Sequence, residues 1–185
     1  ETVAIFGIGG VGINAVQGAA VKGAAKVIAV DLVDFKLEMA EEMGATHTIN
    51  NSREDPVARI LELTNGIGAD KTIVTIDVVQ PEHIGMAYKA TRKAGRTVVV
   101  GLAPVGVDRM DVPPLDLVLM QKEIVGSLYG NSNPRADLPR YLELYRTGTL
   151  KVDELITKTY TLDQINEGYQ DMLEGRNIRG VIRYQ

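Results

Sequence analysis

The sequence predicts an α/β fold in which helices cover both faces of a doubly wound parallel sheet. The first observation is a rhythm: short apolar runs alternate with helix-length amphipathic stretches over residues 1–130, which is typical of repeated strand–helix–strand units. The second observation is that the apolar runs are continuous. Parallel strands buried on both faces have this pattern, whereas strands with one solvated face alternate apolar and polar residues.

Three strands and three helices account for the first part of the chain. We expect the strands at residues 3–6, 26–30 and 47–49 and the helices at residues 11–22, 36–43 and 56–63. Gly44 follows the second helix, and Asn65 and Gly66 follow the third. Glycine and asparagine commonly adopt the left-handed conformation that ends a helix, so both helices have a defined end.

The rest of the sheet is expected between residues 71 and 129. Strands are predicted at residues 71–76, 97–100 and 124–129, with a helix at 82–92. Pro81 favours the start of that helix, and Gly95 favours its end. Residues 102–114 contain three prolines, which predicts a loop before the apolar segment 115–120.

The pattern changes after residue 130. Helices are predicted at residues 138–146 and 162–173, and strands at 156–160 and 180–184. Asp163 stands just before an apolar periodic stretch and is a candidate for its N-cap. The sequence therefore predicts two parts, a sheet domain at residues 1–130 and a C-terminal α+β segment at residues 131–185.

Composition limits the class of protein. At 185 residues the chain can form one full-sized domain and a small appendage. The net charge of −4 argues against nucleic acid and anionic membranes as partners, and no run of about 18 apolar residues could span a bilayer. No secretory signal stands at the start, so the chain is expected to be cytoplasmic. It begins directly in a strand without Met, which suggests a piece of a longer protein.

A glycine motif, Gly-Ile-Gly-Gly-Val-Gly, follows the first predicted strand and opens the first helix at residues 7–12. Gly7 allows a tight turn, Gly9 lets the backbone approach a pyrophosphate, and Gly12 lets helix and strand pack closely. Free N–H groups at the helix start face the anion, helped by the helix dipole. Glycine-rich turns are common, but the strand–helix context favours a dinucleotide site. The predicted diphosphate-binding residues are Gly7, Gly9, Gly10, Val11 and Gly12.

Asp31 stands at the end of the second predicted strand, about 20 residues beyond the last glycine of the motif. A carboxylate at this point accepts hydrogen bonds from the ribose hydroxyls of adenosine. It also repels a 2′-phosphate, and the neighbouring Leu32 offers no guanidinium to hold one. NAD is therefore favoured over NADP. The alternative is that Asp31 only caps the next turn, as acids at strand ends often do.

Taken together, these residues resemble the zinc-containing medium-chain alcohol dehydrogenases. The segments that carry the resemblance follow in the family's order and are residues 3–19, 27–31, 35–36, 42–46, 98–101, 126–130, 165–169 and 177–180. The match covers essentially all 185 residues. It implies an NAD-binding Rossmann domain followed by the C-terminal segment of a catalytic domain whose N-terminal part is missing. Residues 13–20 and 177–182 are similar to a bacterial branch that includes nicotinoprotein and thiol-dependent formaldehyde dehydrogenases.

The resemblance also implies roles for positions outside the glycine motif. Lys36 matches a lysine that contacts the adenosine ribose. Arg179 matches an arginine that reaches the pyrophosphate, a task suited to its planar guanidinium. Val78 matches a residue near the bridge between adenosine and nicotinamide. The positions that match residues holding the nicotinamide ring are Val100, Leu102, Ser127 and Tyr129.

The reaction of the resembled family is hydride transfer between an alcohol and NAD, which gives an aldehyde or a ketone. Zinc polarises the alcohol oxygen there, but the family's zinc ligands lie in the preceding domain. This chain has no cysteine and two histidines, so we assign it no metal ligand and no catalytic residue, and we expect the fragment to be inactive. His47 is expected at the surface or packed, and His83 is expected to be exposed. Asp77 is expected to cap the helix near Pro81.

Two alternatives remain open from the sequence. The chain could come from a zinc-free quinone or enoyl reductase of the same superfamily, but those usually prefer NADPH, which Asp31 disfavours. It could also be a stand-alone NAD-binding module. In either case the apolar strand at residues 124–129 would lie at a sheet edge, and exposed edges invite pairing with another chain. We therefore expect a homodimer through this edge, with a small-molecule alcohol or aldehyde as the substrate.

Overall fold

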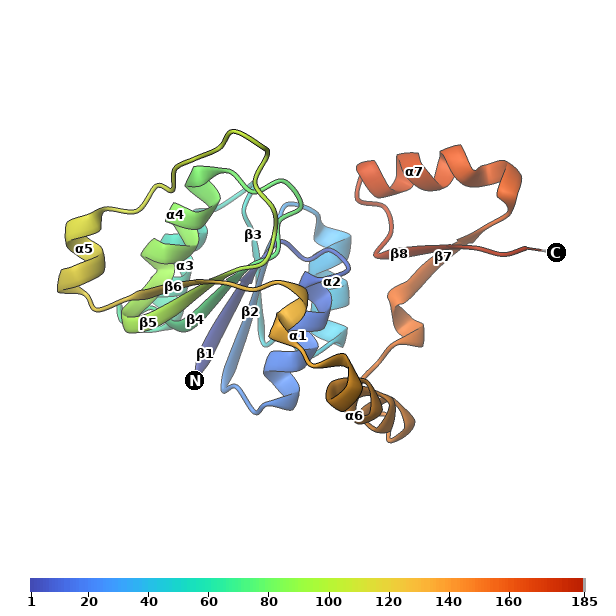
Figure 1. Ribbon diagram of the computed structural model, residues 1–185, viewed down its shortest axis with the longest axis horizontal. Helices are drawn as coiled ribbons and strands as arrows, with labels where there is room; N and C mark the ends of the chain where they lie inside the picture. Colours follow the sequence, from blue (N-terminus) through green and yellow to red (C-terminus); the bar gives the residue numbers. More distant parts are fainter. Residues whose placement is uncertain (185) are drawn as a thin grey trace. The chain divides into compact units, whose positions relative to one another are not determined.

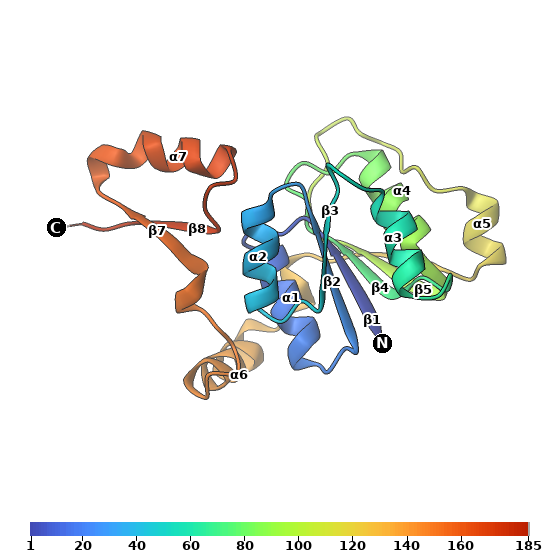
Figure 2. The ribbon, with the colours of Figure 1, turned by 180° about the vertical axis from the view of Figure 1, so that it is seen from behind.

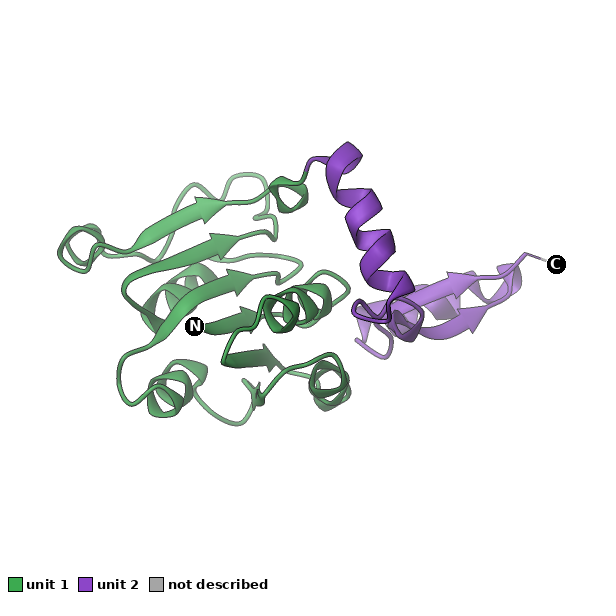
Figure 3. Cartoon of the chain, turned by 90° about the horizontal axis from the view of Figure 1, so that it is seen from below, with its two compact units in different colours: residues 1–132 green, residues 133–185 purple. Residues whose placement is uncertain are grey.

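A six-stranded sheet forms the centre of the first unit of the protein, Glu1–Ser132. The computed structural model describes residues 1–184 and divides into two units (Figures 1 and 3). The strand order is β3-β2-β1-β4-β5-β6, and every adjacent pair is parallel. This is the order of the Rossmann fold, so the predicted doubly wound parallel sheet is confirmed. The strands are β1 (Thr2–Phe6), β2 (Lys26–Asp31), β3 (His47–Asn50), β4 (Ala69–Val74), β5 (Thr91–Val99) and β6 (Glu123–Gly126).

Helices cover both faces of this sheet (Figures 1 and 2). The helices of this unit are α1 (Gly12–Val21), α2 (Asp34–Glu42), α3 (Pro56–Leu63), α4 (Pro81–Ala90) and α5 (Pro114–Leu119). α1 packs against α2, and α3 packs against α4. The connections around α1 and α2 cross the sheet in one direction and those around α3 and α4 in the other. Because such crossovers are right-handed, the two pairs lie on opposite faces.

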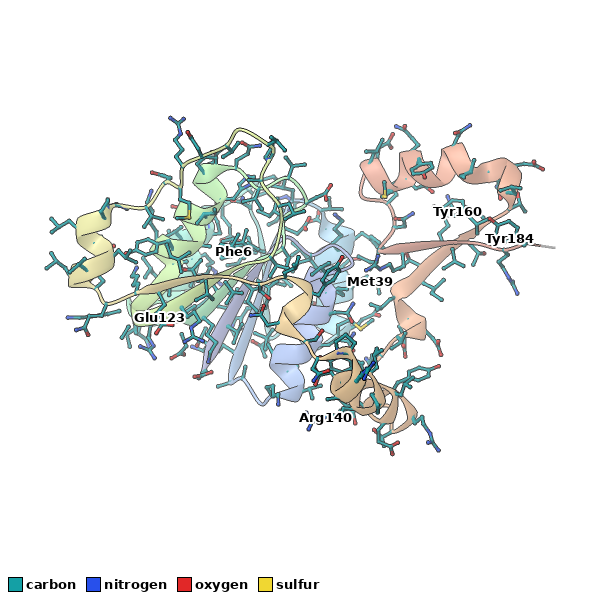
Figure 4. The ribbon with its side chains drawn as sticks, viewed as in Figure 1. Phe6, Met39, Glu123, Arg140, Tyr160 and Tyr184 are labelled. Carbon is teal, nitrogen blue, oxygen red and sulfur yellow. The ribbon has the colours of Figure 1, made fainter. Side chains whose placement is uncertain are left out.

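The core of the first unit lies between the sheet and these helices. Residues 3–6 of β1 and residues 27–30 of β2 are all buried. Phe6, labelled in Figure 4, is 1% exposed. Burial on both faces of the sheet is the reason why these strands are continuous apolar runs in the sequence.

The fourth helix is shorter than predicted, and the fifth strand is longer. α4 ends at Ala90 rather than at residue 92, because Thr91 has an extended backbone with φ −77° and ψ 135°. The Thr91 hydroxyl also donates to the carbonyl of Ala87 at 2.8 Å, which closes the last turn. Gly95 therefore lies inside β5 and does not end the helix.

The sixth strand ends three residues earlier than predicted, at Gly126 rather than at residue 129. The N–H of Ser127 still donates to the carbonyl of Val99 at 2.9 Å, but β5 itself ends at Val99. No length of β5 is then left to pair with the residues that follow. Tyr129 has φ 49° and begins a short 3-10 turn, η1 (Tyr129–Asn131).

The second unit begins at Asn133 (Figure 3). Its elements are α6 (Pro134–Arg146), η2 (Asp153–Leu155), β7 (Ile156–Tyr160), η3 (Leu162–Gln164), α7 (Ile165–Leu173) and β8 (Arg179–Ile182). β7 and β8 form a parallel pair. α6 starts four residues before the predicted 138, since Pro134 fits the first turn of a helix, where an N–H needs no helical acceptor.

The helix predicted at residues 162–173 is the 3-10 turn η3 followed by α7. Thr161, and not Asp163, is the cap at its start. The Thr161 N–H donates to the side-chain oxygen of Gln164 at 3.0 Å in a capping box. The hydroxyl residue two positions earlier therefore takes the place predicted for the acid.

A buried carboxylate holds α7 against β7. Asp171 of α7 is 2% exposed, and Tyr160 of β7, labelled in Figure 4, is 3% exposed. The Asp171 oxygens accept hydrogen bonds from Lys158 Nζ at 2.6 Å and from the Tyr160 hydroxyl at 2.6 Å. Arg176 Nε adds a third bond at 2.7 Å. These donors, Lys158 first, hold the pKa of Asp171 well below its usual range.

Candidate dinucleotide-binding site

The glycine loop joins the end of β1 to the start of α1, and two of its positions leave no room for a side chain. Gly7 has φ 92°, and a Cβ there would lie 2.8 Å from the backbone nitrogen of Ile76. A Cβ on Gly12 would lie only 1.9 Å from the carbonyl oxygen of Gly7. The tight turn and the close approach of helix and strand therefore both require glycine.

The same loop offers a cradle for an anion. A Cβ on Gly9 would meet nothing within 4 Å, so the backbone there is open to a ligand. No side chain caps the first turn of α1. Within residues 1–184, no group accepts a hydrogen bond from the N–H of Gly10, Val11 or Gly12. Free donors at the positive end of a helix suit a diphosphate, and the residues present therefore fit that group.

Asp31, the last residue of β2, contacts both the loop and the next turn. Its Oδ2 accepts the N–H of Ile8 at 2.7 Å. Its Oδ1 accepts the N–H of Leu32 at 2.8 Å and that of Val33 at 3.1 Å. The capping role considered as an alternative is therefore real. It does not use the whole carboxylate, because each oxygen has two lone pairs and Oδ2 has accepted one bond.

Four other predicted positions follow the carboxyl ends of β4, β5 and β6. Val78 and Leu102 form an isolated parallel bridge, so the segments after β4 and β5 lie side by side. Their side chains are 53% and 74% exposed. The carboxyl ends of parallel strands meet at one edge of a sheet, where the glycine loop also lies. The positions brought to this edge are Val78, Val100, Leu102 and Ser127.

Three further predicted positions are Lys36, Tyr129 and Arg179. Lys36 is half-buried in the first turn of α2, the helix that follows Asp31. Tyr129 lies in the turn after β6 and is 87% exposed. Arg179 is the first residue of β8 in the second unit, and its side chain is exposed. The cofactor contacts assigned to these three residues stay predictions.

Asp77 and His83 differ from expectation. Asp77 is exposed and is not the cap of α4, because Gln80 occupies the N-cap position. The Gln80 N–H donates to His83 Nδ1 at 3.1 Å, which explains why His83 is half-buried rather than exposed. His47 is half-buried, with Nδ1 2.8 Å from the hydroxyl of Thr46.

Residues 1–184 hold neither a cluster of metal-ligating side chains nor a membrane-spanning helix. Residues 1–184 contain no group of three or more His, Cys, Asp and Glu side chains placed to hold a metal ion. Among the same residues, every helix is too short or too polar to cross a membrane.

One residue that contacts the loop was not identified from the sequence. The Thr75 hydroxyl, just after β4, lies 2.6 Å from the carbonyl oxygen of Gly7. In the sequence, Thr75 is one more β-branched residue of a predicted strand at 71–76. The only available signal was a hydroxyl near the carboxyl end of a strand, where ligand sites of this fold form.

Comparison with known proteins gives the family. The family model described as zinc-binding dehydrogenase matches residues 10–147. This chain belongs to the zinc-binding dehydrogenase family. The resemblance to zinc-type alcohol dehydrogenases predicted from the sequence is thereby confirmed.

Curated relatives of this zinc-binding dehydrogenase chain are alcohol dehydrogenases. The chain is 45% identical to the NDMA-dependent alcohol dehydrogenase of Amycolatopsis methanolica over 184 residues, which is 100% of this chain and 49% of the relative. It is 40% identical to alcohol dehydrogenase B of Mycobacterium tuberculosis over 184 residues, again 100% of this chain and 49% of the relative. The chain thus spans about half the length of these relatives.

Solved structures of dehydrogenases share the fold. The benzyl alcohol dehydrogenase of Acinetobacter calcoaceticus has a TM-score of 0.92 at 33% identity, over 100% of this chain and 49% of that chain. A protein of Sinorhizobium meliloti, solved bound to NADP, has a TM-score of 0.78 at 30% identity, over 90% of this chain and 47% of that chain.

Proposed function

We propose that this chain is the NAD-binding part of an alcohol dehydrogenase, which transfers hydride between an alcohol and NAD to give an aldehyde or a ketone. The proposal depends on two features at one sheet edge. The uncapped start of α1 suits a diphosphate, and the Asp31 carboxylate beside it suits a ribose. The reaction class comes from the relatives, which are named as alcohol dehydrogenases.

In this proposal the chain's own residues bind and orient the cofactor. The backbone N–H groups of residues 10–12 bind the diphosphate, and the unused lone pair of Asp31 Oδ2 accepts a ribose hydroxyl. Lys36, in the first turn of α2, adds a positive charge at the ribose. When bound, NAD supplies the hydride-transfer chemistry. The residues proposed to line its nicotinamide end are Val78, Val100, Leu102, Ser127 and Tyr129.

We propose NAD rather than NADP because of charge. The Asp31 carboxylate repels a 2′-phosphate, and the adjoining Leu32, 61% exposed, offers no compensating cation. The neighbour from Sinorhizobium meliloti was solved with NADP, so the choice must be measured for this chain. A preference for NADP would instead favour the zinc-free reductase alternative.

The rest of the proposal concerns the parent enzyme. We place the alcohol pocket and the catalytic zinc in the half of the relatives that this chain does not span. The chain alone is then expected to bind NAD without turning over alcohol, in the cytoplasm. A homodimer is proposed through β6, the outermost strand of the sheet. Light scattering tests the dimer, and a clean monomer at tens of micromolar would contradict it.

Titration calorimetry tests the cofactor assignment. NAD and NADP are titrated into the native chain, into Asp31→Asn and into a control, Asp34→Asn. The control removes the same charge three residues away, from an exposed carboxylate that contacts Asn50 and Arg53. We expect the native chain and Asp34→Asn to prefer NAD by roughly tenfold or more, and Asp31→Asn to lose most of that preference.

Three results would contradict the proposal or the part assigned to Asp31. Equal affinities of the native chain for NAD and NADP would remove the assigned role of Asp31. Failure of the native chain to bind either dinucleotide would remove the cofactor site itself. A loss of preference that is as large in Asp34→Asn would show that net charge alone, and not the position of Asp31, decides the choice.

A further inference from the structure

We propose that Thr75 is a positioning residue for the cofactor, because Thr75 and Asp31 hold the two ends of the same peptide group. This group joins Gly7 to Ile8, so its carbonyl belongs to Gly7 and its N–H to Ile8. Thr75 bonds to the carbonyl, and Asp31 bonds to the N–H. The inference rests on the NAD-binding function proposed above.

The Thr75 hydroxyl donates a hydrogen bond to the carbonyl oxygen of Gly7. Its oxygen lies 2.6 Å from the Gly7 carbonyl oxygen and 3.1 Å from that of Phe6, and a hydroxyl has one proton to donate. The Phe6 carbonyl already accepts the backbone N–H of Thr75 at 2.8 Å. The nearer acceptor, Gly7, therefore receives the hydroxyl proton.

Asp31 holds the peptide group from the opposite side. β1 lies between β2 and β4 in the sheet. Thr75 follows β4, whereas Asp31 ends β2, and its Oδ2 accepts the Ile8 N–H at 2.7 Å. Ile8 is 0% exposed, so this end of the peptide group is also buried. The peptide plane cannot rotate without breaking at least one of these two bonds.

The orientation of this peptide group decides two features of the proposed site. Gly7 adopts φ 92°, but glycine populates other backbone conformations about as readily. The two hydrogen bonds therefore hold the peptide group in one orientation. The bond from Ile8 also orients the Asp31 carboxylate proposed to bind the ribose. Finally, a Cβ added at Gly12 would lie 2.7 Å from Thr75 Oγ1. The same hydroxyl thus lies against the helix start proposed to bind the diphosphate.

Three variants of the 185-residue chain separate positioning from general stability. Thr75→Val keeps the β-branched shape and removes the donor, and Thr75→Ser restores the donor. Thr72→Val is the matched control on β4, since its hydroxyl is fully buried and bonds to Thr91 and Thr97 instead of the loop. NAD affinity is measured by calorimetry. Deuterium exchange of the Ile8 amide is measured by NMR without cofactor.

We expect Thr75→Val to weaken NAD binding by roughly tenfold, the effect of one lost hydrogen bond, and to speed the exchange of the Ile8 amide. Thr75→Ser should bind NAD within about twofold of the native chain and keep the native exchange rate. Thr72→Val should lower stability and leave both readouts unchanged. If Thr75→Val does not fold, Thr75→Ala takes its place as the variant without a hydroxyl, and both readouts are compared with those of Thr75→Ser.

The inference is overturned if Thr75→Val binds NAD like the native chain or leaves Ile8 exchange unchanged. It is also overturned if Thr75→Ser does not restore both readouts, because the hydroxyl would then not be the cause. A native chain that binds no dinucleotide overturns the proposed function and the cofactor role of Thr75 together. In that case the Ile8 exchange rates still show whether Thr75 holds the peptide group.

Discussion

Replacing Gly12 by alanine tests the packing of the glycine loop against α1 directly. Gly12 is the first residue of α1, and a Cβ there would lie 1.9 Å from the Gly7 carbonyl oxygen. A separation below 3.0 Å is essentially never seen for a Cβ, so the loop and the helix must part by roughly 1 Å.

The magnitude follows from this displacement. Forcing a methyl group into a packed site costs about 1–3 kcal/mol, and the better helix propensity of alanine returns at most about 1 kcal/mol. We therefore expect Gly12→Ala to lower the free energy of unfolding by up to about 3 kcal/mol. A hydrogen bond lengthened by about 1 Å is lost. Losing two charge-assisted bonds to the diphosphate, at about 1.5 kcal/mol each, weakens NAD binding roughly 100-fold.

Urea denaturation followed by circular dichroism measures the first effect, and calorimetry with NAD measures the second. Gly18→Ala is the matched control in the same helix, since a Cβ at Gly18 would meet nothing within 4 Å. It should stabilise the chain by up to about 1 kcal/mol and leave NAD binding unchanged. The reasoning is refuted if Gly12→Ala is as stable as Gly18→Ala, or if both bind NAD like the native chain.

Three further changes have expected outcomes. Tyr88 is 1% exposed, and its hydroxyl makes no hydrogen bond of good geometry within residues 1–184, although burial and the nearby Asp116 carboxylate raise its pKa to about 12. Tyr88→Phe should therefore lower the free energy of unfolding by less than about 1 kcal/mol or raise it, as measured by urea denaturation. His83→Ala removes the acceptor of the Gln80 N–H and should cost about 1 kcal/mol by the same assay. The pKa of Asp171 is lowered in the folded state. The ionised carboxylate therefore stabilises the fold fully above the unfolded-state pKa of about 3.9, and this stabilisation is lost as the pH falls from there through the lower folded-state pKa. Thermal melts from neutral to acid pH should show this loss in the native chain, with a flatter acid dependence in Asp171→Asn.

These three predictions fail in different ways. A clear destabilisation by Tyr88→Phe would mean that the hydroxyl has a bonding partner after all. Unchanged stability in His83→Ala would mean that the Gln80 N–H finds another acceptor, such as water. Parallel acid dependence in the native chain and Asp171→Asn would place the acid-sensitive group elsewhere.

Much of the fold could be predicted because its signals are local. The buried strands are continuous apolar runs, and α3 was predicted with its observed bounds, Pro56–Leu63, since proline opens it and asparagine follows it. The errors arose where a neighbouring strand decides the structure. β6 stops at Gly126 because β5 ends beside it, and the sequence of residues 127–129 contains no sign of that end.

The candidate site divides in the same way. The glycine motif and Asp31 are recognisable because their spacing follows from the strand–turn–helix geometry itself. The contact of Thr75 with Gly7 joins residues 68 positions apart, and it exists only because β4 pairs with β1. The Gln80–His83 cap was missed for another reason. Histidine and glutamine are uncommon in that role, so Asp77 was the more obvious candidate.

The bonds that Asp31 makes to the loop and to the next turn have a consequence for any redesign of the proposed coenzyme preference. A change to glycine or alanine would relieve the repulsion of a phosphorylated ribose, but it would also leave the amide of Ile8 without its acceptor. The loop would lose order together with selectivity. A successful exchange must therefore keep a neutral oxygen at position 31, as in asparagine or serine, and supply the new cation from a different residue.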